Sequence, residues 1–146
     1  MSRGIPNAAR QGVQAVGYRD LEVWQLAMSL VEHCYRSTTE FPKSELYGVT
    51  GQLRRAAVSI PANLAEGHSR RTTKAYLNHV NIALGSQGEL DTLLEVASRL
   101  GYLARDEKDS LATTSNAVGR LLHGLRKALE AKLRSGDGMT APSDTR

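Results

Sequence analysis

Apolar residues recur at three- and four-residue steps along four stretches of the chain, and no stretch alternates residue by residue as a strand would. The first stretch begins after Asp20, which we interpret as a helix N-cap. It ends before the sequence FPKS, because Pro42 keeps the preceding residue out of the helical conformation. One apolar face is predicted for this helix, made of Trp24, Ala27, Met28, Val31, Cys34 and Tyr35.

The other three stretches also read as helices separated by short polar connections. They run from Ser44 or Thr50 to Glu66, from Ser69 to Gly101, and from Asp106 to before Gly136. Gly67 is interpreted as the left-handed residue that ends the second helix. Because short connections force consecutive helices to run antiparallel, the pattern predicts an all-α, up-down-up-down four-helix bundle over residues 18–134. The flanks, 1–17 and 135–146, are expected to form a flexible N-terminal arm and a disordered tail.

The second helix is unusual, since Pro61 lies near its middle and apolar residues cover two of its faces. Two interpretations remain open. In one, the proline bends the helix around its neighbours within one subunit. In the other, the second apolar face docks on another copy of the chain, which places Val58, Pro61, Ala62 and Ala65 in an oligomer interface.

Composition narrows the class of protein. The chain has 146 residues, 40% of them hydrophobic, which suits one globular domain, and its 5% aromatic content disfavours a β-sandwich. A lone cysteine, Cys34, excludes an internal disulfide and fits a reducing cytosol. No apolar run has the length of a membrane span, and the N-terminus lacks the apolar core of a signal peptide.

Signatures of enzymes, metal sites and cofactors are missing. None of the four histidines has a glutamate three residues before it, as a di-iron bundle requires. The segment GSQG at residues 85–88 lacks a phosphate-loop lysine and is interpreted as a close helix crossing. Glu66 and Glu89 are expected to pair with Arg54 or Arg55. We therefore expect a protein that is not an enzyme and needs no cofactor.

Charge is unevenly distributed, within a net charge of +4. Arg70, Arg71 and Lys74 begin the third helix, where the helix dipole disfavours cations. In an antiparallel pair they meet the end of the fourth helix, which carries Arg126, Lys127, Lys132 and Arg134. The N-terminal arm, with Arg3, Arg10 and Arg19, reaches the same end. This basic end is either a solvated surface or a contact for phosphates; Arg54 and Arg55 are weaker candidates nearer the acidic end.

Three segments together resemble one protein family. They are YRDLEVW at residues 18–24, FPKSELYGVTGQLRRAAVSIPANLAEG at 41–67 and ALGSQGEL at 83–90. The chain resembles bacterial four-helix-bundle proteins encoded within intervening sequences of 23S ribosomal RNA genes, and is similar to accessory proteins of diversity-generating retroelements. The resemblance implies ring-shaped homo-oligomers, commonly pentamers, that bind nucleic acid through basic surface. Its retroelement relatives also engage a reverse transcriptase.

These observations predict a cytosolic homo-oligomer, with a pentamer favoured, that binds nucleic acid, RNA above all, with low sequence specificity. Several basic ends on one ring would strengthen a weak single contact by avidity. The main alternative is a scaffold that binds a protein partner such as a polymerase. The second alternative is an enzyme or a bundle that holds a cofactor.

Overall fold

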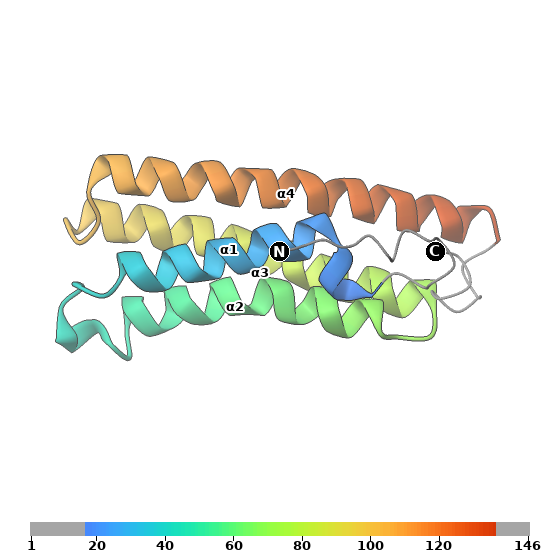
Figure 1. The fold of residues 1–146 in the computed structure, drawn as a ribbon, viewed down its shortest axis with the longest axis horizontal. Coiled ribbons are helices and arrows are strands. Elements are labelled where there is room, and N and C mark those ends of the chain that lie inside the picture. The colour runs from blue at the N-terminus through green and yellow to red at the C-terminus, as the bar shows by residue number, and fades with distance from the viewer. Residues whose placement is uncertain (1–16, 137–146) are drawn as a thin grey trace, which may run out of the picture.

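A computed structural model describes residues 17–136 as a bundle of four long helices (Figure 1). The helices are α1 (Glu22–Ser37), α2 (Val49–His68), α3 (Thr73–Arg99) and α4 (Arg105–Arg134). Two short 3-10 turns, η2 (Tyr18–Asp20) and η3 (Lys43–Glu45), precede α1 and α2. The predicted all-α four-helix bundle is confirmed. Most of the predicted arm, with Arg3 and Arg10, and residues 137–146 of the predicted tail lie outside the described residues.

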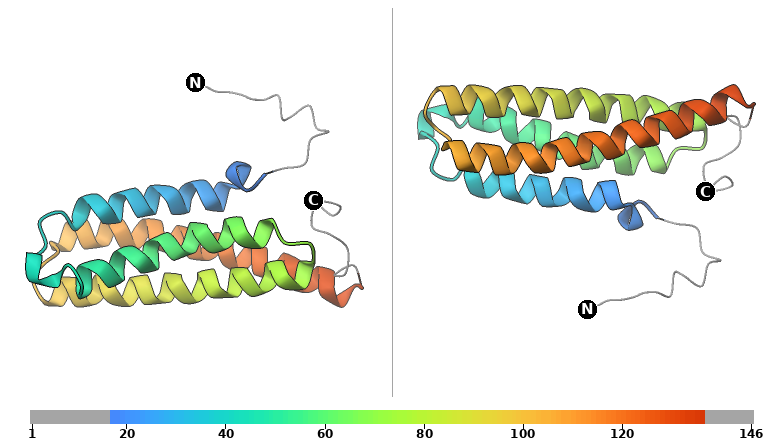
Figure 2. Two further views of the ribbon diagram at one scale, coloured as in Figure 1. Left: turned by 90° about the horizontal axis from the view of Figure 1, so that it is seen from below. Right: turned by 90° about the horizontal axis from the view of Figure 1, so that it is seen from above.

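Consecutive helices run antiparallel, and each packs on its neighbours in a ring. α2 packs against α1 and α3, and α4 packs against α3 and α1 (Figures 1 and 2). The loops between α1 and α2 and between α3 and α4 therefore lie at one end of the bundle. At the other end, the turn between α2 and α3 lies beside the C-terminus of α4.

The helices differ greatly in length, which shapes the core. α1 has 16 residues and α4 has 30, so they span about 24 Å and about 45 Å. The main apolar core runs through all four helices and is centred on Leu30, Leu53, Ile60, Leu90 and Leu122. A second, smaller core of Tyr76, Val80 and Leu129 lies between α3 and α4, toward the end where α1 begins. At that end the core is therefore formed by fewer than four helices.

Several predicted helix boundaries need correction. Asp20 lies in η2, and the residue before α1 is Leu21. The N-cap of α3 is Thr72 rather than Ser69, since the Thr72 hydroxyl accepts a hydrogen bond from the Ala75 amide at 3.1 Å. Helical geometry in α2 continues to His68, one residue past Gly67.

Gly67 is therefore not a left-handed stop, but a buried residue inside α2. A Cβ atom at this position would lie 2.7 Å from the His79 Cβ on α3. Such separations are too short for two carbon atoms, so the glycine permits a close contact between α2 and α3. Past the ends of α3 and α4, Gly101 and Gly136 do adopt the left-handed conformation, with φ of 80° and 89°.

Pro61 sits within an uninterrupted α2, and its ring is buried inside the chain. The polar residues around it hydrogen-bond along α2. The Asn63 amide donates to the Ser59 carbonyl at 2.9 Å, and not to the carbonyl that Pro61 leaves without a partner, that of Ala57. Burial of Pro61 supports the interpretation in which the proline serves packing within one subunit.

The two loops at the end away from the basic residues are tied together. The Tyr102 hydroxyl donates to a Glu45 carboxylate oxygen at 2.8 Å, and the Glu45 carboxylate also accepts from the Val49 amide at 3.1 Å. The Phe41 and Tyr102 rings pack with centroids 5.5 Å apart. Both hydrogen bonds favour the ionised carboxyl, so they hold the pKa of Glu45 below its ordinary value.

Candidate nucleic-acid interface

Seven of the predicted cationic residues belong to the α2–α3 turn, the first turn of α3 and the last turns of α4. These segments lie at one end of the bundle (Figure 1). Tyr76 on α3 packs with Leu129 on α4, which places the first turns of α3 beside the last turns of α4. We call this end the basic pole. Its members are Arg70, Arg71, Lys74, Arg126, Lys127, Lys132 and Arg134.

Most of these cations are not neutralised by a nearby acid. Arg70 lies 3.8 Å from Glu66 in an exposed pair. The other six have no carboxylate within 4.0 Å among residues 17–136. Arg126 donates from Nη2 to the His123 Nδ1 at 3.0 Å, a contact between neighbouring turns of α4. The pole therefore presents a cluster of positive side chains to solvent.

The start of α3 brings backbone N–H donors to this pole, where α2 and α4 end with their carbonyl groups. α3 begins here, so its first backbone N–H groups point toward the same end. Thr72 satisfies one of them, and the first turn holds Lys74 with no acidic residue. A helix start with cations and no acid is unfavourable for the helix alone but attracts anions such as phosphate.

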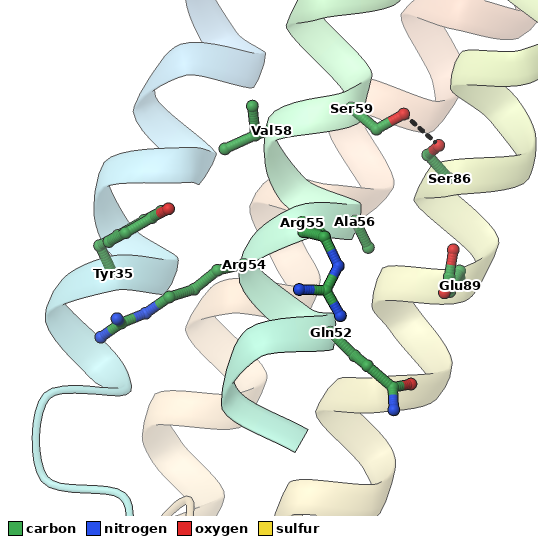
Figure 3. Close-up of a pocket in the computed structure, with 9 residues that line it drawn as sticks. All are labelled: Tyr35, Gln52, Arg54, Arg55, Ala56, Val58, Ser59, Ser86 and Glu89. Atoms are coloured by element: carbon green, nitrogen blue, oxygen red, sulfur yellow. Dashed lines mark hydrogen bonds between the residues drawn. The ribbon is translucent and has the colours of Figure 1, made fainter. Parts of the chain in front are cut away.

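Arg54 and Arg55 do not join the basic pole. They lie in the first half of α2, on the half nearer the two loops, as the sequence predicted (Figure 3). Arg54 is half-buried and donates from Nε to the Thr38 Oγ1 at 2.9 Å. The Arg54 guanidinium also stacks over the Tyr35 ring, 4.6 Å from its centroid. This arginine therefore links α2 to the end of α1.

The expected ion pairs of these arginines are wrong. Glu66 contacts Arg70 and lies 3.9 Å from the His79 Nε2. Within the described part of the chain, Glu89 has no ion pair at all. Glu66 is too far from Arg55 to pair with it, because it lies three turns further along α2.

An open pocket surrounds Arg55 on the outer surface of α2 (Figure 3). Its volume is about 660 Å³. The lining residues come from three helices: Tyr35 of α1, Ser86 and Glu89 of α3, and Gln52, Arg54, Arg55, Ala56, Val58 and Ser59 of α2. This pocket could not be predicted from the sequence, because residues of α1 and α3 complete it.

Two polar contacts between α2 and α3, which we call the polar ladder, were also not predicted from the sequence. Ser59 and Ser86 share a hydrogen bond of 2.7 Å, and the Asn63 Oδ1 lies 3.0 Å from the His79 Nδ1. Ser59 and Asn63 are four residues apart on α2, and His79 and Ser86 are seven residues apart on α3. Each helix therefore presents its two polar residues on one face, and these spacings can be read from the sequence. The ladder specifies how α2 and α3 pack.

The segment GSQG has a different role from the one predicted. Gly85 and Gly88 are exposed, and a Cβ atom at either would meet no neighbouring atom within 4 Å. The close crossing of α2 and α3 depends on Gly67 instead. Gln87 of this segment faces α4, where its amide donates to the Ser115 carbonyl at 3.1 Å, and it also donates to the Asp91 carboxylate within α3 at 3.1 Å.

Two acids at the opposite end of the bundle have basic partners. The Glu95 carboxylate contacts Arg99 at 2.8 Å and Lys108 at 2.9 Å, and these contacts lower the pKa of Glu95 to about 2. Glu107 accepts from the Ser37 hydroxyl and lies 2.9 Å from the His33 Nε2. These two hydrogen bonds lower the pKa of Glu107.

The predicted oligomer face divides into exposed and buried parts. Val58 is 41% exposed, Ala62 is exposed and Ala65 is half-buried. Pro61 is buried within the chain and offers almost no surface to another subunit. Tyr35 on α1 and Ile82 on α3, the two helices that pack beside α2, are 42% and 44% exposed. The face of α2 between them remains a prediction for the subunit contact.

Other chemistry is limited in the described part of the chain. Burial raises the pKa of the Cys34 thiol to about 12, so it is not a ready nucleophile. No group of three or more His, Cys, Asp or Glu side chains within residues 17–136 is arranged to hold a metal ion. None of the described helices is both long and apolar enough to cross a membrane.

The fold and the exposed chemistry define an antiparallel four-helix bundle with a basic pole. The chain belongs to the family of 23S rRNA-intervening sequence proteins, whose sequence model matches residues 19–124. It is also similar in fold to a crystal structure from Bacteroides thetaiotaomicron, described as a protein with unknown function from the S23 ribosomal protein family. That similarity has a TM-score of 0.67 at 23% identity and covers 72% of this chain and 95% of the other. No curated protein matches the sequence.

Proposed function

We propose that the protein is a non-enzymatic, cytosolic homo-oligomer that binds nucleic acid, RNA above all, through its basic pole. The observation that carries the proposal is the set of six cations at this pole without an acidic partner among the described residues. Phosphates would supply the missing negative charge, and the start of α3 adds favourable backbone dipoles. Such contacts follow the backbone of the nucleic acid and carry little sequence information.

Assembly would strengthen this binding. A single pole of seven side chains makes few phosphate contacts, and each is weak at physiological salt. Several poles held on one ring, with a pentamer favoured, would engage one nucleic acid at high effective concentration. The partly exposed face of α2 around Val58 supports self-association, because the neighbouring helices α1 and α3 also expose large apolar side chains, Tyr35 and Ile82.

The experiment compares RNA retention by two charge-reversal variants of equal net charge. Arg70→Glu with Arg71→Glu changes the pole, and Arg105→Glu with Arg120→Glu changes exposed arginines elsewhere on α4. We expect the pole variant to lose at least about tenfold in affinity for a single-stranded RNA, and the control variant to lose much less. Circular dichroism checks that both remain helical. Equal affinities for the two variants would contradict binding at the pole.

A second candidate function is a scaffold for a protein partner, such as a reverse transcriptase or another polymerase. The observation that favours it lies at the end opposite the pole, where Tyr47 is 90% exposed, Leu100 53% and Leu46 48%. Exposed apolar side chains grouped at one end are typical of protein contacts. Salt separates the two functions, since phosphate binding weakens steeply between about 50 and 200 mM salt and apolar docking does not.

A further inference from the structure

The pocket around Arg55 is the feature that the proposed function leaves unexplained. Its volume of about 660 Å³ falls in the range of about 300–1,000 Å³ that small-molecule sites occupy. Glu89 on its α3 side lies 16 residues along α3 from Thr73, so it is about 24 Å from the helix start at the basic pole. A ligand in this pocket would not touch the pole.

The α2 side of the pocket is positive and partly rigid. Arg54 is held by the Thr38 hydroxyl and by the Tyr35 ring, against α1. Arg55 is exposed, and its guanidinium faces the α3 side together with the Gln52 amide (Figure 3). Among residues 17–136, neither guanidinium has a carboxylate within 4.0 Å. An arginine with free donors beside an amide is a suitable site for a phosphate group.

The α3 side of the pocket carries acceptors. Glu89 lies across from Arg55 and has no ion pair within the described residues (Figure 3). Ser86 lines the same side and hydrogen-bonds at 2.7 Å to Ser59 of α2. A carboxylate would repel a second phosphate but would accept hydrogen bonds from hydroxyl groups.

We propose that this pocket binds the ribose-phosphate unit of a nucleotide. Arg55 and Gln52 bind the phosphate monoester, Arg54 adds a fixed positive charge nearby, and Glu89 accepts hydrogen bonds from the sugar hydroxyls. A bare phosphate would leave Glu89 without a partner, and an acidic peptide would place further negative charge beside it. The same chemistry is offered by a free mononucleotide and by the 5′-phosphate end of an RNA. The inference does not rest on the basic pole.

The test follows the arginine Nε–H signals of the full chain by NMR while a ligand is added. The probes are AMP, ribose 5-phosphate, inorganic phosphate and adenosine. We expect AMP and ribose 5-phosphate to shift the Arg55 signal to saturation at millimolar concentrations, and adenosine to leave it unchanged. Arg120, an exposed arginine on α4, is the internal control and should not shift.

Two variants separate the contacts. Arg55→Gln, in which binding is followed through the Arg54 Nε–H signal, should weaken AMP binding at least about tenfold, because a charged hydrogen-bond donor to phosphate is lost. Glu89→Gln should weaken binding of ribose 5-phosphate relative to that of inorganic phosphate. Both positions are exposed, so neither change should prevent folding. Equal AMP affinity of the wild type and Arg55→Gln would overturn the proposal.

Further titrations of the variant with Arg70→Glu and Arg71→Glu, which lacks these contacts of the basic pole, show whether the phosphate belongs to a free nucleotide or to an RNA end. Saturation by AMP supports a free nucleotide as the ligand. Saturation only by a 5′-phosphorylated oligoribonucleotide, and not by its 5′-hydroxyl form, supports an RNA end. If no phosphate-bearing probe saturates the Arg55 signal, the pocket proposal is wrong, while RNA retention at the pole stays a separate measurement.

Discussion

Gly67 and Gly85 are both glycines inside long helices, but their surroundings differ completely. At Gly67, an added Cβ would lie 2.7 Å from the His79 Cβ and 3.0 Å from the Tyr76 Cδ1. At Gly85, nothing lies within 4 Å of the added atom. The first glycine therefore sets the distance between α2 and α3, and the second only lowers helix propensity.

Replacing each glycine with alanine should give opposite results. Gly67→Ala should destabilise the protein by about 1–3 kcal/mol, since α2 and α3 must move apart and that cost exceeds the gain in helix propensity. Gly85→Ala should stabilise it by up to about 1 kcal/mol. The free energies of unfolding come from chemical denaturation. A stabilising effect at Gly67 would contradict the close contact.

At the scale of helices, the α3–α4 pair is joined by polar contacts along its length. Gln87 and Asp91 on α3 both contact Ser115 on α4, with a short 2.6 Å bond from the Ser115 hydroxyl to Asp91. One turn further along α3, Glu95 contacts Lys108. These contacts fix the register in which the two long helices pack, and so bring their cationic ends together at the basic pole.

The Glu95 contacts should make stability depend on pH in the acid range. Because the folded-state pKa is about 2, below the ordinary 4.5, folding favours the ionised carboxyl. This stabilisation is complete above pH 4.5 and is lost as the pH falls toward 2.

Glu95→Gln should therefore lower the thermal midpoint slightly at neutral pH, and the difference from the wild type should shrink below pH 4.5. Glu32→Gln is the control, since Glu32 is exposed and has no ion pair within residues 17–136. Thermal melts across this pH range measure both variants. A difference for Glu95→Gln that stayed constant down to low pH would contradict the assignment.

The whole molecule separates its chemistry along its long axis. Within residues 17–136, cations without an acidic partner lie at one end, the Glu95 ion pairs and exposed apolar residues lie at the other, and the outer face of α2 lies between them. A ring of such bundles built through α2 would leave the poles free to act together. The proposed contact with RNA and the proposed subunit contact thus use different parts of one surface, whereas the pocket around Arg55 shares Tyr35 and Val58 with the subunit contact.

Self-association should depend on Val58. In sedimentation experiments the wild type should have a mass several times the 15.9 kDa of one chain, and Val58→Glu should have the mass of a single chain. A charge in the centre of an apolar contact is costly to bury, whereas Leu100→Glu changes the far end of the bundle and should leave assembly intact. A wild type that sediments as one chain would end the oligomer proposal.

The amino-acid sequence by itself determined the four helices, their antiparallel order and the gathering of cations at one end. These properties depend on local periodicity and short connections, which a linear chain displays directly. Tertiary structure alone decided that Gly67 is a contact rather than a stop, that Glu66 pairs with Arg70, and that Arg55 faces a pocket completed by Glu89. Each of these depends on the rotation and register of one helix against another, which are set by packing among residues far apart in the chain.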